Sequence, residues 1–197
     1  MPRHIDHDQR RREVTEAVWR VIRRAGLARA SVRAVAQEAG LSVGALRHFF
    51  SEQRDLQIYA FRMINEQARE RIEAVPESLS VRNRIEENMW ALLPVTPEQV
   101  EEEQVRLAFL VESRTDPELA ELVAEDRAVL TDLMREAVIA LRTIGELPAS
   151  IEVDATVTEM AALLDGLAQA AALNPEDMPG YRIKATVVRW LNELPTR

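Results

Sequence analysis

The sequence predicts an all-α protein of nine helices in two domains, with a small N-terminal head and a larger C-terminal body. Apolar residues recur at spacings of three and four along successive segments, which is the period of a helix with one buried face. Glycine, proline and capping residues separate these segments, and no segment has the alternation that is typical of a strand. We expect the head over residues 1–51 and the body over residues 52–197.

Composition excludes several classes of protein. A hydrophobic share of 47% over 197 residues is typical of a folded chain, and the absence of cysteine excludes disulfides, thiolate metal sites and thiol redox sensing. No uninterrupted apolar run exceeds five residues, whereas a membrane-spanning helix needs about 20. The N-terminus MPRHIDHDQRRR lacks the apolar core of a signal peptide. We therefore expect a soluble, cytoplasmic protein with no membrane contact.

The net charge of −8 is unevenly placed along the chain. Up to Asp55 the sequence has 11 arginines and 7 acidic residues, a net charge of +4, whereas the remainder carries −12. A basic segment of this kind suits a polyanion such as DNA, and an acidic body repels DNA from the other faces. A solvated surface is the alternative interpretation, which we adopt for the acidic body.

Ala30 to Phe50 predicts a helix-turn-helix, around which the whole chain can be interpreted. Gly40 is the residue type that ends a helix in the left-handed region, and Ser42 is a good N-cap for a second helix. Two helices joined by so short a turn cross steeply, and the first turns of the second can enter a DNA major groove. The sequence therefore predicts DNA binding. The apolar positions of the two helices are Val32, Val35, Ala36, Ala39, Leu46 and Phe50.

Other segments complete the head and join it to the body. Residues 14–25 have apolar positions at helical spacing and end at Gly26, which predicts a first helix that covers the helix-turn-helix. The second helix runs from its cap at Ser31 to about residue 39, and the third covers about 43–49. A fourth helix over about 52–75 is long enough to leave the head and enter the body.

The body has further helices with clear start and stop signals. Ser80 caps a helix that ends at Pro94, and Thr96-Pro97-Glu98-Gln99 combines an N-cap, a proline at the first helical position and a capping-box glutamine. Asp116-Pro117-Glu118 repeats the start signal for a long helix that stops at Gly145. Two more helices are expected over 151–173 and 177–194.

The sequence lacks the patterns of an enzyme or a metal site. It has no glycine-rich phosphate loop, nucleophile elbow or paired His and acid cluster, so we expect no catalytic residue and no cofactor. His4 and His7 have a metal-ligand spacing but no third ligand nearby, so we expect no metal. Arg3 and the Arg10-Arg11-Arg12 run suit phosphate contacts instead. A helical adaptor that binds no DNA is the other alternative, and it leaves the basic head unexplained.

The chain resembles the TetR family of transcriptional regulators. The resemblance rests on SVRAVAQEAGLSVGALRHFFSEQRDL, within residues 10–56, and on the nine-helix layout. The GALRHFF and VESRTDPEL segments are similar to the branch typified by the choline-responsive betaine-pathway repressor. The family implies a homodimer on a palindromic operator and a pocket for a small-molecule inducer in the body. It also implies repression that the inducer relieves, with activation as the alternative.

The resemblance implies which residues contact DNA. Arg33 matches a base-reading position on the second helix, where an arginine can hold a guanine with two hydrogen bonds. Gln53 stands where the family often has a phosphate-binding lysine; either Arg54 replaces that contact or backbone N–H groups at the helix start make it. The recognition turn and its exposed face match Ser42, Val43, Gly44, Ala45, Arg47 and His48.

Two sets of residues in the body are candidates for the inducer pocket and the dimer interface. Packing in the chain's own core is the alternative for the apolar members. A cationic ligand or an ion pair is expected for the acidic ones. The pocket candidates are Met63, Trp90, Leu93, Phe109, Glu112, Met134 and Asp165. The dimer candidates, from two helices per subunit, are Ala161, Leu164, Ala168, Val187, Val188, Trp190, Leu191 and Leu194.

Overall fold

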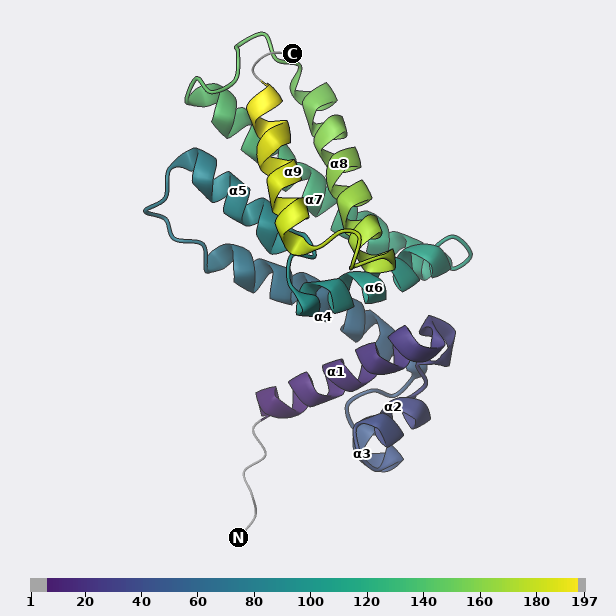
Figure 1. Ribbon diagram of the computed structural model, residues 1–197. Coiled ribbons are helices and arrows are strands. Elements are labelled where there is room, and N and C mark those ends of the chain that lie inside the picture. The colour runs from purple at the N-terminus through teal and green to yellow at the C-terminus, as the bar shows by residue number, and fades with distance from the viewer. Residues whose placement is uncertain (1–6, 195–197) are drawn as a thin grey trace. The chain divides into compact units, whose positions relative to one another are not determined.

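The computed structural model describes residues 7–194, with their side chains from residue 12 onward. Arg3, His4 and the side chains of His7, Arg10 and Arg11 lie outside the described part, so their interpretations stay predictions. Within the described range every regular element is helical, which confirms the all-α fold (Figure 1). The helices are α1 (His7–Ala25), α2 (Val32–Glu38), α3 (Val43–Arg47), α4 (Gln53–Glu73), α5 (Val81–Leu92), α6 (Pro97–Glu112), α7 (Pro117–Thr143), α8 (Val153–Leu173) and α9 (Gly180–Glu193), with the 3-10 turn η1 (Leu27–Arg29) after α1.

Most helix ends follow the predicted signals, but α1 begins at His7 rather than near residue 14, α3 ends at Arg47 rather than near residue 49, and the last helix begins late. At the start of α6, the Gln99 N–H donates to Thr96 Oγ1 at 3.3 Å and the Thr96 N–H donates to Gln99 Oε1 at 3.1 Å, which is the predicted capping box. The last helix begins at Gly180 rather than at Asp177. The reason is that the Asp177 N–H bonds back to the carbonyl oxygen of Asn174 at 3.1 Å, which closes a turn between α8 and α9.

Contacts divide the described chain into two compact units. The first contains residues 7–66 and 104–122, and the second contains residues 67–103 and 123–194. The described part of the predicted head therefore lies within the first unit, together with the start of α4 and the corner between α6 and α7. The boundary between residues 51 and 52 stays a prediction. Helices α4, α6 and α7 each carry residues of both units.

The core of the first unit is formed by one face of α1 and the helices that pack on it. Val18 of α1 is fully buried, as its spacing predicted. Trp19 donates its Nε1–H to the carbonyl oxygen of Ala60 at 3.1 Å, which satisfies the buried indole. Phe61 and Phe109 are fully buried, with ring centroids 4.9 Å apart. Burying each such side chain contributes about 1.5–3 kcal/mol, so this core holds α1 and α4 in place.

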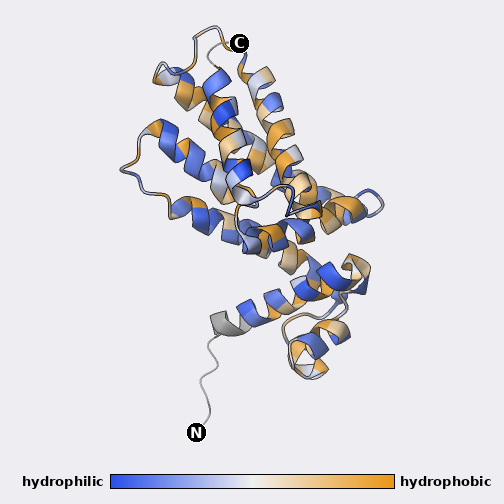
Figure 2. Cartoon of the chain, viewed as in Figure 1, coloured by the Kyte–Doolittle hydropathy of each residue, from blue (hydrophilic) through white to orange (hydrophobic). Residues whose placement is uncertain are grey.

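The core of the second unit lies between α5, α7, α8 and α9. Its buried members include Met89 from α5, Leu141 from α7, Met160 from α8 and Leu191 from α9. Figure 2 shows apolar residues along most of α8, which its alanine-rich sequence predicted. The unit is therefore stabilised chiefly by aliphatic burial, worth about 25 cal/mol per Å².

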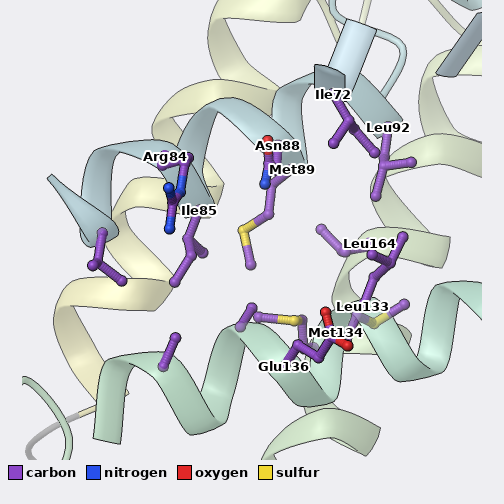
Figure 3. Close-up of a pocket in the computed structure, with 14 residues that line it drawn as sticks. Ile72, Arg84, Ile85, Asn88, Met89, Leu92, Leu133, Met134, Glu136 and Leu164 are labelled. Atoms are coloured by element: carbon purple, nitrogen blue, oxygen red, sulfur yellow. The ribbon is translucent and has the colours of Figure 1, made fainter. Parts of the chain in front are cut away.

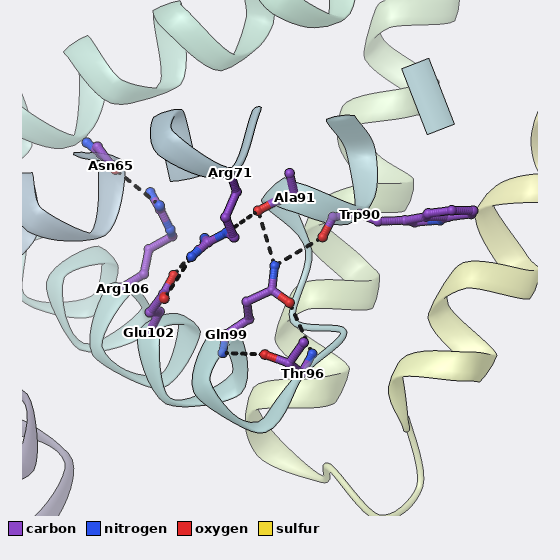
Figure 4. Close-up of polar contacts among 8 residues, drawn as sticks. All are labelled: Asn65, Arg71, Trp90, Ala91, Thr96, Gln99, Glu102 and Arg106. Atoms are coloured by element: carbon purple, nitrogen blue, oxygen red, sulfur yellow. Dashed lines mark hydrogen bonds and ion pairs between the residues drawn. The ribbon is translucent and has the colours of Figure 1, made fainter. Parts of the chain in front are cut away.

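A buried polar network joins three helix ends in the second unit (Figure 4). Gln99 donates through Nε2 to the carbonyl oxygens of Trp90 and Ala91 at 3.1 and 3.2 Å. Arg71 donates through Nε to the carbonyl oxygen of Ala91 at 2.9 Å, and its guanidinium holds both carboxylate oxygens of Glu102 at 2.9 and 2.8 Å. Because these bonds satisfy carbonyl groups that a helix end leaves open, they fix the end of α5 against α4 and α6.

Candidate functional site

The helix-turn-helix is closed by hydrogen bonds that its sequence predicts. Gly40 has a φ of +66°, and the N–H of Leu41 reaches back to the carbonyl oxygen of Ala36 at 2.8 Å, as in a Schellman motif. Ser42 then caps α3, its Oγ accepting from the Ala45 N–H at 3.1 Å. These local bonds end α2 and begin α3 within a few residues, so the two helices hold a fixed geometry.

The residues predicted to contact DNA on α2 and α3 are all exposed, whereas Val35 and Leu46 of the same helices are fully buried. Neither Arg33 nor Arg47 has an ion-pair or hydrogen-bond partner among the described residues. Both guanidinium groups are therefore available to an outside anion. Their contact with DNA stays a prediction. The exposed set is Arg33, Ser42, Val43, Gly44, Ala45, Arg47 and His48.

Phe49 is a further exposed residue, which the sequence interpretation missed. Its side chain is 47% exposed, and its ring lies edge-on to the ring of His48 at 5.7 Å between centroids. A phenyl ring beside α3 can make the apolar contact that a thymine methyl group offers. Spacing alone carries no clear signal for this exposure, because Phe49 and Phe50 follow Leu46 by three and four residues, and both spacings are typical of one helix face.

Two further arginines of the first unit, Arg20 and Arg24, have a protein partner. Arg20 Nε lies 2.9 Å from one carboxylate oxygen of Glu38, and Arg24 Nη2 lies 3.0 Å from the other. The two guanidinium hydrogen bonds lower the pKa of the Glu38 carboxyl. Part of the basic charge is thus balanced within the unit, whereas the charges of Arg33 and Arg47 on the helix-turn-helix are not.

The start of α4 differs from the arrangement that the resemblance implies. Arg54 bonds Asp116 through Nη2, and its Nε lies 3.2 Å from a carboxylate oxygen of Glu118. The bond from Arg54 lowers the pKa of the Asp116 carboxyl, which therefore stays ionised at neutral pH. Gln53 donates through Nε2 to the carbonyl oxygen of Ala28 at 3.1 Å. Both side chains have protein partners, and a phosphate must compete with two carboxylates to reach Arg54.

The second unit contains a cavity of about 250 Å³ between α5 and α7, with further lining residues from α4 and α8 (Figure 3). Apolar walls with few polar groups are typical of small-molecule sites. The polar lining residues are Arg84, Asn88 and Glu136, and the sequence interpretation missed all three. A polar residue on an amphipathic helix gives the same pattern whether it faces solvent or a cavity. The apolar lining residues are Ile72, Val81, Ile85, Met89, Leu92, Leu133, Met134, Ala137, Ala140, Met160 and Leu164.

Of the predicted pocket residues, Met134 lines this cavity. Phe109 belongs to the first unit, where it is fully buried against Phe61. Met63 and Glu112 also belong to the first unit, so they do not line the cavity of the second. Their spacing correctly indicated a helix face, but it does not tell which other helix covers that face.

The remaining pocket candidates lie in the second unit, away from the cavity wall. Leu93 is buried in the core. The ammonium nitrogen of Lys184 lies 4.5 Å from the centroid of the Trp90 ring, so a cation already occupies one face of this ring. Asp165 pairs with Arg127 at 2.8 Å, so its carboxylate takes the ion pair that was the alternative to a cationic ligand.

The predicted dimer residues divide between the core and the surface of the second unit. Five are buried in the core, which is the alternative that the sequence left open: Leu164, Val187, Trp190, Leu191 and Leu194. Ala161, Ala168 and Val188 are half-buried. The same two helices expose other residues, among them Leu173 at 65% and Tyr181 at 72%. On α8 the exposed positions at helical spacing are Ala162, Gly166, Gln169 and Leu173.

The described part of the chain has neither a membrane-spanning helix nor a cluster of metal-ligating side chains. No helix there is long and apolar enough to cross a membrane. No group of three His, Cys, Asp or Glu side chains comes together there in a way that could hold a metal ion.

A helix-turn-helix with free, exposed arginines, in a helical chain that also contains an apolar cavity, defines the class of DNA-binding transcriptional regulators. Residues 14–58 match the family described as bacterial regulatory proteins, tetR family. Residues 81–195 match the C-terminal domain of the BetI-type transcriptional repressors. The chain belongs to the TetR family of transcriptional regulators.

Relatives match nearly the whole chain. The HTH-type transcriptional regulator PksA of Bacillus subtilis (strain 168) is 32% identical over 98% of this chain and 94% of its own length. The regulator BetI of Vibrio vulnificus (strain YJ016) is 28% identical over 93% of this chain and 91% of its own. These relatives are regulators and not enzymes.

Solved structures of regulators have the same fold. A transcriptional regulator from Rhodococcus sp. Rha1 has a TM-score of 0.78 at 26% identity, over 94% of this chain and 96% of its own. A regulator from Saccharomonospora viridis, solved in complex with choline, has a TM-score of 0.80 at 20% identity, over 93% of this chain and 96% of its own. At that identity the likeness shows the fold alone.

Proposed function

We propose that this regulator is a ligand-responsive repressor. In this proposal it binds a palindromic operator as a homodimer and leaves it when a small molecule fills the cavity of the second unit. The observation that carries the proposal is the pair of free, exposed arginines on the helix-turn-helix, Arg33 and Arg47. The match of residues 81–195 to BetI-type repressors supports repression. Because the operator lies on the chromosome, the place of action that we propose is the cytoplasm.

Recognition of the operator rests on α2 and α3. Arg33 projects from α2 with no competing carboxylate, so it is free to hold a guanine edge through two hydrogen bonds. Arg47, at the end of α3, supplies a charge for a backbone phosphate or a second base. The small side chains at Gly44 and Ala45 allow the backbone of α3 to approach the groove.

Dimerisation places two such heads on two half-sites. We infer that the interface uses the exposed faces of α8 and α9 rather than the buried residues of the same helices. Ala162 and Gly166 are small and exposed, so they let helix backbones approach closely, and Leu173 and Tyr181 add apolar area at the ends. A large apolar side chain left in water is a frequent mark of a protein interface.

Two helices link the cavity to the DNA-binding unit along the chain. Ile72 of α4 and Met134 of α7 line the cavity, and these helices begin at Gln53 and Pro117, which belong to the first unit. A ligand shifts the equilibrium between DNA-binding and released forms only by its different affinity for the two. In this proposal, the ligand favours positions of α4 and α7 in which the two heads no longer match the half-sites.

The test is a mobility shift of the purified protein on DNA from upstream of its own gene, with random DNA as competitor. We expect a saturable complex that survives competitor and forms in steps of two protein chains per operator. The operator lies upstream of the protein's own gene only if the protein regulates that gene. A second experiment therefore uses the same protein to pull down its binding sites from fragmented genomic DNA. Binding no tighter than to random DNA in both experiments would sink the proposal.

A further inference from the structure

We propose that α3 reads its operator chiefly through apolar contacts, and that it recognises the methyl groups of thymines in the major groove. The inference rests on the proposed function, in which α2 and α3 contact DNA, and it names the base chemistry that α3 selects. Three observations on the described residues of the first unit carry it.

The first observation is that the first turn of α3 has no side chain that can hydrogen-bond to a base edge. Val43, Gly44 and Ala45 are exposed and carry no polar side-chain atom. The hydroxyl oxygen of Ser42, just before them, serves as the N-cap and accepts from the Ala45 N–H at 3.1 Å. In a helix-turn-helix the N-terminal residues of the second helix contact the base edges. From Val43 to Ala45, the side chains therefore cannot read the donors and acceptors of a base pair.

The second observation is that large apolar side chains are exposed at both ends of α3. Val43, its first residue, is 37% exposed, and Phe49, two residues beyond its end, is 47% exposed. Among the described residues of the first unit, the other exposed large apolar side chain is Val111 of α6. Single apolar residues scattered over a surface need no explanation, but two of them on one short helix, with Gly44 and Ala45 between them, form an apolar surface.

Thymine is the base that offers an apolar group in the major groove. Its methyl group projects there beside the O4 acceptor, and alanine and phenylalanine side chains pack against it. The methyl groups of a valine provide the same kind of contact. A helix of the length of α3 extends about 7.5 Å, which spans about two base-pair steps of 3.4 Å. Val43 and Phe49 can therefore meet thymines at different base pairs of one half-site.

The third observation is that free positive charges accompany this apolar surface. Arg33 of α2 and Arg47 of α3 are exposed and have no partner within the described residues. Their charges supply the attraction to the phosphates and a polar base contact, so the first turn of α3 is free to make apolar contacts. Free guanidinium groups around an apolar surface are complementary to DNA, in which phosphates flank the methyl groups of the groove.

The experiment begins with a selection by the full-length protein from a library of DNA duplexes with a randomised centre of about 20 base pairs, enough for two half-sites. Each thymine of the selected duplex is then replaced by deoxyuridine, which lacks the methyl group and keeps every hydrogen-bonding atom. Affinity is measured by fluorescence anisotropy. We expect at least one thymine, replaced in both half-sites, to weaken binding about tenfold, because a buried methyl group is worth about fourfold in each half-site. Replacing thymines outside the half-sites should leave affinity within about twofold.

Variants place the effect on α3. Val43→Ala should reduce the effect of deoxyuridine at one thymine to within about twofold, and Phe49→Ala should do so at a second thymine. Val111→Ala is the matched control, since Val111 is an exposed valine of the same unit on α6; it should keep the full effect at both thymines. Arg33→Ala should weaken binding of both duplexes and keep their ratio, because it removes a contact to a different base.

Three outcomes would overturn the inference: selected half-sites without thymine, equal affinity for the thymine and deoxyuridine duplexes at every position, or an effect of deoxyuridine that persists in both Val43→Ala and Phe49→Ala. The selection separates the inference from the proposed function. A selection that enriches no sequence contradicts the proposed function, and the inference falls with it. An enriched operator that binds equally well with deoxyuridine contradicts only the apolar reading by α3.

Discussion

At the residue scale, some polar side chains have hydrogen-bond or ion-pair partners within the chain and others do not. The carboxylate of Glu102 is nearly buried and receives two hydrogen bonds from Arg71, so it serves the fold. Arg33 and Arg47 are exposed and have no partner within the described part of the chain, and Asn88 has a buried oxygen without a donor there. The free guanidinium groups of Arg33 and Arg47 lie on the two helices that we propose to contact DNA.

The Glu102 pair gives the first prediction. Glu102→Gln leaves the guanidinium of Arg71 without its counter-charge in a half-buried position, and we expect the free energy of unfolding to fall by about 2–4 kcal/mol. The measurement is urea unfolding followed by circular dichroism. Glu73→Gln is the control, since Glu73 pairs with Arg69 on the surface of α4 at 2.7 Å, and its loss should cost less than about 0.5 kcal/mol. Similar losses in the two variants would contradict a structural role for the buried network.

At the element scale, local signals predict where helices begin and end. The capping box at Thr96 and Gln99 and the left-handed glycine at Gly40 are both as expected, because each depends on a few neighbouring residues. The pocket could not be predicted in the same way. Helical spacing gives the buried face of α6, which includes Phe109, but does not reveal that Phe61 rather than a cavity covers it. Likewise, Asn88 is one of several polar residues on α5, and only the fold places its amide on a cavity wall.

Replacing either of two glycines of the helix-turn-helix by alanine should change the stability of the fold, but in opposite directions. Gly40→Ala forces a Cβ into the left-handed region at a φ of +66°, and we expect a loss of about 1–2 kcal/mol of stability. Gly44 lies within α3, and a Cβ added there would meet no heavy atom within 4 Å, so Gly44→Ala should gain about 0.5 kcal/mol from helix propensity. Thermal unfolding of both variants checks this, and a stabilised Gly40→Ala protein would refute the assigned turn.

The bond between Arg54 and Asp116 gives a prediction about pH and DNA affinity. Arg54 depresses the pKa of Asp116 in the folded protein, so this pair stabilises the fold above the unfolded-state pKa of about 4, and its contribution is lost as the pH falls through the lower folded value. We expect no contribution from Asp116 to pH dependence between about 5 and 8. Asp116→Asn should weaken the acid-induced loss of stability below about pH 4 in an unfolding titration.

The same variant tests whether Arg54 can reach DNA. Asn is also a good N-cap, so Asp116→Asn keeps the start of α7 while releasing one partner of Arg54. If the freed guanidinium then meets a phosphate, the slope of log affinity against log salt should become steeper by about 0.9. An unchanged slope would show that Arg54 serves only to join α4 to the start of α7.

At the scale of the whole molecule, the proposed dimer depends on residues that the sequence alone did not single out. The sequence identified α8 and α9 but selected mainly their buried residues, because burial in a core and burial in an interface require the same apolar pattern. The exposed set became visible only when the core of the second unit was known. Leu173 of α8, at 65% exposed, is the large aliphatic residue of that set.

A charge at Leu173 should separate the subunits without unfolding them. We expect Leu173→Glu to shift the protein from dimer to monomer in sedimentation velocity and to lower operator affinity at the same concentration, because each monomer holds only one half-site. Val129→Glu is the matched control on α7, since Val129 is 60% exposed, and it should stay dimeric. A dimeric Leu173→Glu protein or a monomeric Val129→Glu protein would exclude this interface.

The most direct test of the central claim is a salt series of operator affinity for the unaltered protein, Arg33→Ala, Arg47→Ala and the control Arg69→Ala. Arg69 is an exposed arginine of the second unit, so its loss should leave operator affinity within about twofold. Arg33→Ala should weaken operator binding about tenfold or more and reduce the preference over random DNA, because it removes a base contact. Arg47→Ala should reduce the salt slope by about one if it meets a phosphate. Operator affinity unchanged in both Arg33→Ala and Arg47→Ala would contradict recognition through α2 and α3.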